Sequence, residues 1–229
     1  MKKYFSQYRQ DEFIDKVVLN RKRNGFFVEI GAHDGISLSN TWFFEKTRSF
    51  GGLCVEPNPA VFELLKKNRK CEVLNTCIAE HDGTVKFLAV EGYSEMLSGI
   101  IDKYHPTHLK RIDNYIAEYG GAKKEIEVKA MRLEDIAWLS NQPIDFISID
   151  TEGNELNILK SIDFSKLNVT CFTIENNYGD PNIEAIMNRN RYIKVKRLGD
   201  DDVYLLKSKY TIAFRIRRRI FHYLNKNKV

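Results

Sequence analysis

The chain has 229 residues, of which 43% are hydrophobic and 29% charged, which suits a soluble domain with a sizeable core. No apolar run approaches the ~18 residues of a membrane span, and the first residues lack the apolar segment of a signal peptide. We therefore expect a cytoplasmic protein. The net charge of +5 is concentrated between Lys209 and Val229, which leaves the rest mildly acidic and makes nucleic acid an unlikely partner.

Short apolar runs alternate with helical segments along most of the chain, which predicts a doubly wound, mostly parallel sheet with helices on both faces. The predicted strands are residues 26–30, 52–56, 72–78, 84–90, 145–150, 170–175, 192–198 and 203–206. The predicted helices are residues 6–20, 40–46, 60–68, 133–139, 155–161 and 182–189. The four cysteines lack paired spacing, so we expect reduced thiols and no zinc site.

Two segments interrupt this alternation. Residues 91–124 are polar and aromatic and too long for a simple connection, so we interpret them as an inserted cap or substrate segment within a domain of residues 1–208. Residues 209–229 form a basic tail whose apolar and basic residues alternate as in an amphipathic helix. Such a helix can pack on its own domain or contact an anionic membrane surface. The sequence does not predict an oligomeric state.

The first motif is a strand that ends in a glycine turn, Val-Glu-Ile-Gly-Ala-His-Asp-Gly at residues 28–35. Gly31 and Gly35 allow the backbone to pass close to a ligand at the carboxyl edge of the sheet. Their G-x-x-x-G spacing differs from the G-x-G-x-x-G of dinucleotide-binding proteins. Glu29 could accept a hydrogen bond from the ammonium group of a ligand. A tight turn beside a surface acid is the structural alternative.

The second motif places Glu56 at the end of the next strand, followed by Pro57. A carboxylate at this position can accept hydrogen bonds from both hydroxyls of a ribose. The alternative is that Glu56 caps the helix that follows.

Two further strands end in oxygen-bearing side chains. Asp150 and Glu152 follow one of them, and Glu175 and Asn176 end the other. If the strands are neighbours, Asp150, Glu175 and Asn176 could bind Mg²⁺ or Mn²⁺. Alternatively, these acids cap helices, orient water or act as a general base without metal.

These motifs together resemble the FkbM family of methyltransferases, through residues 28–35, Val-Glu-Pro-Asn-Pro at 55–59 and Ile-Asp-Thr-Glu-Gly-Asn-Glu at 149–155. The resemblance implies a class I methyltransferase fold with seven strands, the last antiparallel. It also implies S-adenosylmethionine as methyl donor and a sugar or glycan hydroxyl as acceptor. Some relatives of this kind are binding or trafficking proteins without turnover.

The resemblance also assigns roles by position. The turn residues Gly31, His33, Asp34 and Gly35, with Glu29, would hold the methionine part of the donor. Glu56 and Pro57 would hold its ribose, and Ala79 and Glu80 would lie near the adenine. Asp150, which would also contact the donor, and Glu152 would face the reacting centre.

We therefore expect in-line methyl transfer to an alcohol oxygen, with the hydroxyl proton removed by a base or the hydroxyl activated by a metal ion. Asp150 is the first candidate for either role, Glu152 lies beside it, and His33 is the second candidate for the base. One alternative function is a nucleotide-dependent oxidoreductase of the NAD type on the same sheet edge, which the missing G-x-G-x-x-G disfavours. The other is a non-catalytic binding or trafficking module.

Overall fold

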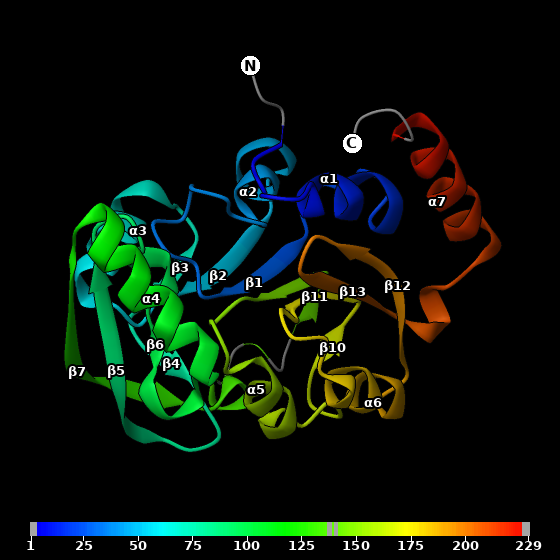
Figure 1. The fold of residues 1–229 in the computed structure, drawn as a ribbon. Helices are drawn as coiled ribbons and strands as arrows, with labels where there is room; N and C mark the ends of the chain where they lie inside the picture. The colour runs from blue at the N-terminus through cyan, green and yellow to red at the C-terminus, as the bar shows by residue number, and fades with distance from the viewer. Residues whose placement is uncertain (1–3, 137–138, 140–141, 226–229) are drawn as a thin grey trace.

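The main sheet of the computed structural model has seven strands in the order β12-β13-β11-β9-β1-β2-β3 (Figure 1). The structure describes residues 4–136, 139 and 142–225. All neighbouring pairs are parallel except those made by β13, which runs antiparallel to both β11 and β12. This confirms the predicted sheet with its antiparallel final strand. The bounds are β1 Phe26–Ile30, β2 Gly51–Val55, β3 Glu72–Leu74, β9 Phe146–Ile149, β11 Cys171–Glu175, β12 Tyr192–Leu198 and β13 Asp201–Leu206.

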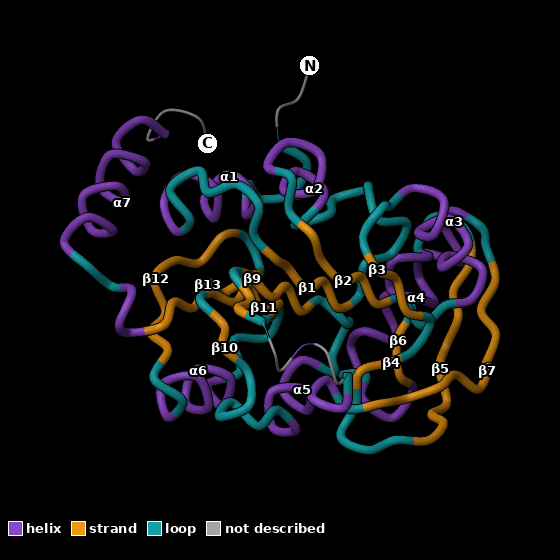
Figure 2. The backbone as a smooth tube through the Cα atoms, turned by 180° about the vertical axis from the view of Figure 1, so that it is seen from behind, coloured by secondary structure: helices purple, strands orange, loops and turns teal. Residues whose placement is uncertain are grey.

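Helices cover both faces because the central strands are apolar on both sides. Phe27 and Phe146 pack in one core cluster, while Val28 and Ile147 pack in another on the opposite face. Figure 2 shows α1 and α2 on one side of the sheet and α5 and α6 on the other. The helix bounds are α1 Gln10–Phe13, α2 Trp42–Arg48, α3 Pro59–Asn68, α5 Glu155–Ser161, α6 Pro181–Arg189 and α7 Ile212–Asn225.

Most predicted helices are confirmed within two residues of their ends, but two differ. The predicted helix 6–20 begins only at Gln10 and continues as a π-helix, Ile14–Val18. The backbone before it is held in a loop, because the carboxylate of Asp11 accepts hydrogen bonds from Phe5 N and Ser6 Oγ. The predicted helix 133–139 is a 3₁₀ turn at Leu133–Asp135, and its residues 137–138 lie outside the described residues.

A second, four-stranded sheet stands beside the main one, in the order β4-β7-β5-β6. It consists of β4 Cys77–Ile78, β5 Gly83–Glu91, β6 Gly99–Ile100 and β7 Ala122–Met131, with α4 Pro106–Tyr119 packed on it. The predicted strand 72–78 is therefore divided between the two sheets. The predicted insert 91–124 begins at the end of β5 and ends inside β7. We call residues 77–131 the cap.

The sequence analysis missed both α4 and β7. Strand β7 pairs with β5 over residues 122–130, yet five of its ten residues are Lys or Glu. Only Ile126, Val128 and Ala130 face the small cap core. Short elements complete the structure: η2 Glu95–Leu97, η3 Ile101–Lys103, η6 Lys207–Lys209, and the paired strands β8 Pro143–Ile144 and β10 Asn168–Val169. Within the described residues, no helix is long and apolar enough to cross a bilayer.

Candidate functional site

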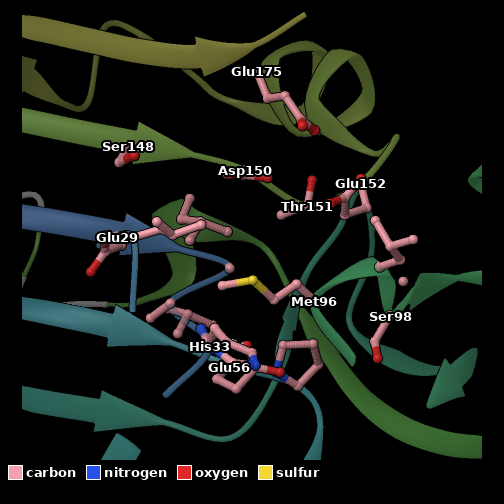
Figure 3. A pocket seen from close by; sticks show the side chains of 18 of the residues that line it. Glu29, His33, Glu56, Met96, Ser98, Ser148, Asp150, Thr151, Glu152 and Glu175 are labelled. Carbon is pink, nitrogen blue, oxygen red and sulfur yellow. Dashed lines mark hydrogen bonds between the residues drawn. The ribbon is translucent and has the colours of Figure 1, made fainter. Parts of the chain in front are cut away.

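A cavity of about 250 Å³ opens where the carboxyl ends of β1, β2, β9 and β11 meet the cap. Ligands in open α/β sheets bind at this edge. The first three strands contribute Glu29, Glu56 and Asp150 to its walls, and the cap contributes Met96 and Ser98 (Figure 3). The three strand ends thus meet at one cavity, although their three carboxylates do not all face it.

The glycine turn is required by close backbone packing. Gly31 has φ +82, and a Cβ atom on it would lie 1.7 Å from the backbone oxygen of Asp150. A Cβ on Gly35, at φ +80, would lie 2.6 Å from a side-chain carbon of Leu65. The amides of Gly31 and Ala32 both donate to the carbonyl of Val55 at 3.0 Å. The turn thereby joins the ends of three strands, which brings the site residues together.

The carboxylate of Glu29 is saturated by groups of the protein. It accepts hydrogen bonds from Asn40 N at 2.9 Å, Thr41 Oγ1 at 2.6 Å and Ser39 Oγ at 3.0 Å. Arg69 Nη1 lies 3.1 Å from Glu29 Oε2. Figure 3 shows the carboxylate directed away from Met96. The expectation that Glu29 receives a ligand's ammonium group is corrected: it orders the backbone at residues 39–41.

Arg69, which the sequence analysis missed, is the partner that makes this arrangement possible. Its side chain is 0% exposed, and besides Glu29 it contacts Glu45 Oε2 at 2.9 Å and the carbonyl of Gly35 at 3.0 Å. It also donates to Thr41 Oγ1 at 2.9 Å. A buried guanidinium is tolerated only when its donors are satisfied. The sequence signal that could have indicated this role was an arginine placed between the predicted helix 60–68 and Cys71.

Glu56 is buried at the end of β2 with its carboxylate in the cavity wall. His33 N donates to Oε2 at 2.9 Å and Asn58 N donates to Oε1 at 2.8 Å. Burial raises its pKa to about 7, although these two backbone donors oppose the shift. Each oxygen can accept a further hydrogen bond. Pro57 lines the cavity beside it.

His33 and Asp34 leave the turn in different directions. His33 Nε2 lies 2.9 Å from Glu95 Oε1 of the cap, and its Nδ1 has no hydrogen-bond partner among the described residues. Asp34 is absent from the described cavity lining, and its Oδ1 accepts from the amides of Ile36 and Ser37. Burial would raise the pKa of Asp34, but these hydrogen bonds lower it. The expected donor contact of Asp34 is therefore corrected to a turn-forming role.

Three carboxylates gather at the other end of the cavity. Asp150, Glu152 and Glu175 each place one oxygen within 4.8 Å of the others, an arrangement that could hold a metal ion. Asp150 is exposed at the cavity, and the groups packed around its carboxyl partly desolvate it. This desolvation and the charge of Glu152 raise the pKa of Asp150 well above its ordinary value. Burial and Glu155 raise the pKa of Glu152 to about 8.

Glu175 completes the acidic cluster, and Asn176 does not belong to it. Burial and the charge of Asp150 raise the pKa of Glu175 well above its ordinary value. Asn176 turns away: its Oδ1 accepts from Asp180 N at 2.7 Å and its Nδ2 donates to Asp202 Oδ2 at 3.2 Å. The metal set expected from sequence is corrected, with Glu152 in place of Asn176.

The residues expected near an adenine, Ala79 and Glu80, do not line the cavity. Thr76, Cys77 and Ile78, slightly earlier in the chain, line it. Glu80 instead faces Lys103, with Oε2 and Nζ 3.9 Å apart. The shift follows from the division of the predicted strand 72–78, since β4 turns into the cap at Ile78.

Asn40 is a second site residue that the sequence analysis missed. Its Nδ2 donates to Ser148 Oγ at 2.9 Å, while its buried Oδ1 has no hydrogen-bond partner among the described residues. Asn40 also lines the cavity. A buried acceptor without a partner is costly in a folded protein, so a donor from a ligand would complete it. The cavity therefore has room for a ligand donor at Asn40 Oδ1 and for further donors at the carboxylate of Glu56.

The sheet order, the antiparallel β13 and the cavity at the strand ends define a Rossmann-like class I methyltransferase. A family model described as the methyltransferase FkbM domain matches residues 29–194, well over half of the chain. The protein therefore belongs to the FkbM methyltransferase family.

Solved structures with weaker likeness include several methyltransferases. An FkbM methyltransferase from Methylobacillus flagellatus KT is 16% identical with a TM-score of 0.46, and the match covers 80% of this chain but only 43% of that one. A precorrin-6y C5,15-methyltransferase from Geobacter metallireducens GS-15 is 11% identical with a TM-score of 0.41, covering 86% and 87% of the two chains. A search of curated proteins gave no significant match.

Proposed function

We propose that this protein transfers the methyl group of S-adenosylmethionine to a hydroxyl of a sugar or glycan. The observation that carries the proposal is the shared cavity, in which Glu56 lies on one wall and the cluster of Asp150, Glu152 and Glu175 on another. The first wall suits an adenosyl ligand, and the second suits removal of a proton from the acceptor.

The donor would be held by residues that the structure leaves with open hydrogen-bonding capacity. Glu56 accepts from the ribose hydroxyls, Asn40 Oδ1 accepts from the ammonium group, and Cys77 and Ile78 contact the adenine. Glu29 acts as a positioning residue, because it orders the segment that carries Asn40. The bound donor supplies a sulfonium that leaves readily, so alignment of the acceptor is the main demand on the protein.

The acceptor proton is the chemical difficulty, since a sugar hydroxyl scarcely ionises at neutral pH. Asp150 faces the cavity, and its raised pKa makes it a stronger base than a free carboxylate. In the metal-dependent version, Asp150, Glu152 and Glu175 would hold Mg²⁺ or Mn²⁺, whose preferred ligands are oxygens. A metal there would lower the pKa of the hydroxyl.

A glycan acceptor is supported by aromatic side chains of the cap. Arg111 lines the cavity and lies 5.4 Å from the ring centroid of Tyr115. Tyr115 in turn contacts the exposed rings of Tyr93 and Tyr119, with centroids 5.8 Å and 6.0 Å away. The aromatic surface thus continues outward from the cavity, as a ligand longer than one sugar would require.

The test is a screen of labelled methyl transfer from S-adenosylmethionine onto glycans and nucleotide sugars, with divalent metal or with chelator. Transfer that Glu56→Gln abolishes and the exposed control Glu63→Gln preserves would support the proposal. Calorimetry with S-adenosylmethionine and NAD side by side covers the oxidoreductase alternative. Binding of NAD alone would overturn the proposal, and an unchanged rate in chelator would remove its metal-dependent version.

A further inference from the structure

Helix α7 presents two different faces, and only one of them is used by the fold. On the inner face Phe214 is 1% exposed, and the ring of Phe221 lies 5.5 Å from that of Phe13. Arg217 Nε donates to the carbonyl of Val17 at 2.8 Å. The helix is therefore anchored on the domain, beyond β12 at the edge of the molecule (Figure 1).

The outer face of α7 carries an exposed apolar row. Ile212, Ile216 and Ile220 follow one another at four-residue spacing, which places them on one side of the helix. Ile212 is 74% exposed and Tyr223 is 79% exposed. Such contiguous exposure of large apolar side chains indicates an interaction surface.

The basic residues around this surface indicate the chemistry of its partner. Arg215 and Arg219 are exposed beside the apolar row, and the segment from Lys209 to Val229 contains seven Lys or Arg and no acid. A cavity of about 970 Å³ lies between α7 and β12, and its described lining includes Arg9, Lys196 and Arg219 but no acidic residue. An exposed apolar row bordered by arginines is typical of helices that lie in the interface of an anionic bilayer.

We propose that the outer face of α7 docks this protein on an anionic lipid surface, with the isoleucine row in the interface and the arginines on the headgroups. A second copy of the chain fits this face poorly, because a two-fold contact would bring the two sets of arginines together. Nucleic acid would leave the isoleucines without a role. Gln7 and Tyr8 line both this cavity and the cavity at the strand ends, so the space between α7 and β12 adjoins the candidate site.

The experiment is co-sedimentation of the whole protein with vesicles of phosphatidylcholine, alone or mixed with phosphatidylserine, at low and high salt. We expect binding to the mixed vesicles that weakens with salt. Arg215→Glu with Arg219→Glu should lower the affinity about tenfold or more, given the usual contribution of each basic residue near such a surface. Ile216→Ser with Ile220→Ser should also lower it, although the net charge is unchanged.

The matched control is Lys66→Glu with Lys67→Glu on α3, which changes the net charge equally at exposed positions of another helix. An equal loss of binding in this control would overturn the proposal. Full binding of the isoleucine variant would also overturn it, because the basic segment would then attract any polyanion. The proposal would also be overturned if light scattering showed that the wild type is a dimer and the isoleucine variant a monomer. Circular dichroism checks that each variant is folded, independently of methyl transfer.

Discussion

The carboxylates at the two ends of the cavity between the strands and the cap have opposite surroundings. Near the glycine turn, Glu29 is surrounded by donors and paired with Arg69. At the far end, Asp150, Glu152 and Glu175 lie close together, and desolvation with the charges of neighbouring carboxylates raises the pKa of each. The first arrangement gives the carboxylate a full set of partners, whereas the second disfavours the ionised form of its three acids.

This difference separates structural acids from candidate functional ones. A buried carboxylate with a complete set of donors organises its own surroundings and has little capacity left for a ligand. A cluster of like charges is costly to maintain, and such clusters with shifted pKa values are common at functional sites. The comparison supports the proposal that Glu56 binds the donor and Asp150 takes part in the chemistry, whereas Glu29 and Asp34 organise the surrounding backbone.

The largest expected effect is on the functional side. Asp150→Asn should lower methyl transfer by roughly 10²- to 10⁴-fold, the usual contribution of a general base, while donor affinity stays mostly unchanged. The thermal midpoint should not fall, since the variant removes a carboxylate that its neighbours repel. Labelled transfer, calorimetry and thermal melting measure the three quantities. The control is Asp102→Asn, which changes an exposed residue of the cap. Full activity of Asp150→Asn would show that Asp150 is not the general base.

On the scaffolding side, Arg69→Met should destabilise the protein by ~3–5 kcal/mol, because it leaves the buried Glu29 and the half-buried Glu45 without their partner. Urea unfolding of the variant and the wild type measures this difference. Adding Glu29→Gln to Arg69→Met should recover part of the loss, since one unpaired charge is then removed. If Arg69→Met is as stable as wild type, then the pairing of Glu29 with Arg69 does not stabilise this end of the cavity.

The raised pKa of Glu56 predicts that the stability of the protein depends on pH. The pKa of Glu56 is raised from 4.5 to about 7 on folding, so the folded state binds this proton more tightly than the unfolded state. The resulting stability is complete below about pH 4.5 and is lost as the pH rises through about 7.

The total contribution of Glu56 is at most about 3 kcal/mol. Chemical unfolding at a series of pH values should show a smaller decline for Glu56→Gln than for wild type. The exposed Glu63→Gln serves as the control, and parallel curves for Glu56→Gln and wild type would show that the carboxyl is not perturbed.

The smallest expected effect concerns Asp34. Asp34→Ala removes the acceptor for the amides of Ile36 and Ser37, which should cost about 1 kcal/mol of stability. Donor affinity should stay unchanged, because Asp34 does not line the cavity. A clear loss of donor binding without a loss of stability would return Asp34 to the ligand contacts expected from sequence.

The apolar strands and the polar residues at their ends were readable from the sequence. The strand 26–30 was predicted with its final bounds, and Glu56 and Asp150 were placed at the cavity because parallel strands end at one edge of the sheet. The exposed strand β7 was missed because its charged residues resemble a solvated loop. Helix α4 was missed because its residues were taken for an irregular insert.

The sequence by itself determined where most strands lie and which acids follow them, because hydrophobic periodicity is a local property. It did not determine which sheet each strand joins, since the predicted strand 84–90 lies in β5 of the second sheet. Only the tertiary structure decided which acids are available. Glu29 lies within β1 and Asp150 directly follows β9, yet Arg69, 40 residues beyond Glu29, pairs with Glu29, while Glu152 and Glu175 lie against Asp150. The charge state of a carboxyl depends on what surrounds it in space, and those neighbours come from distant parts of the chain.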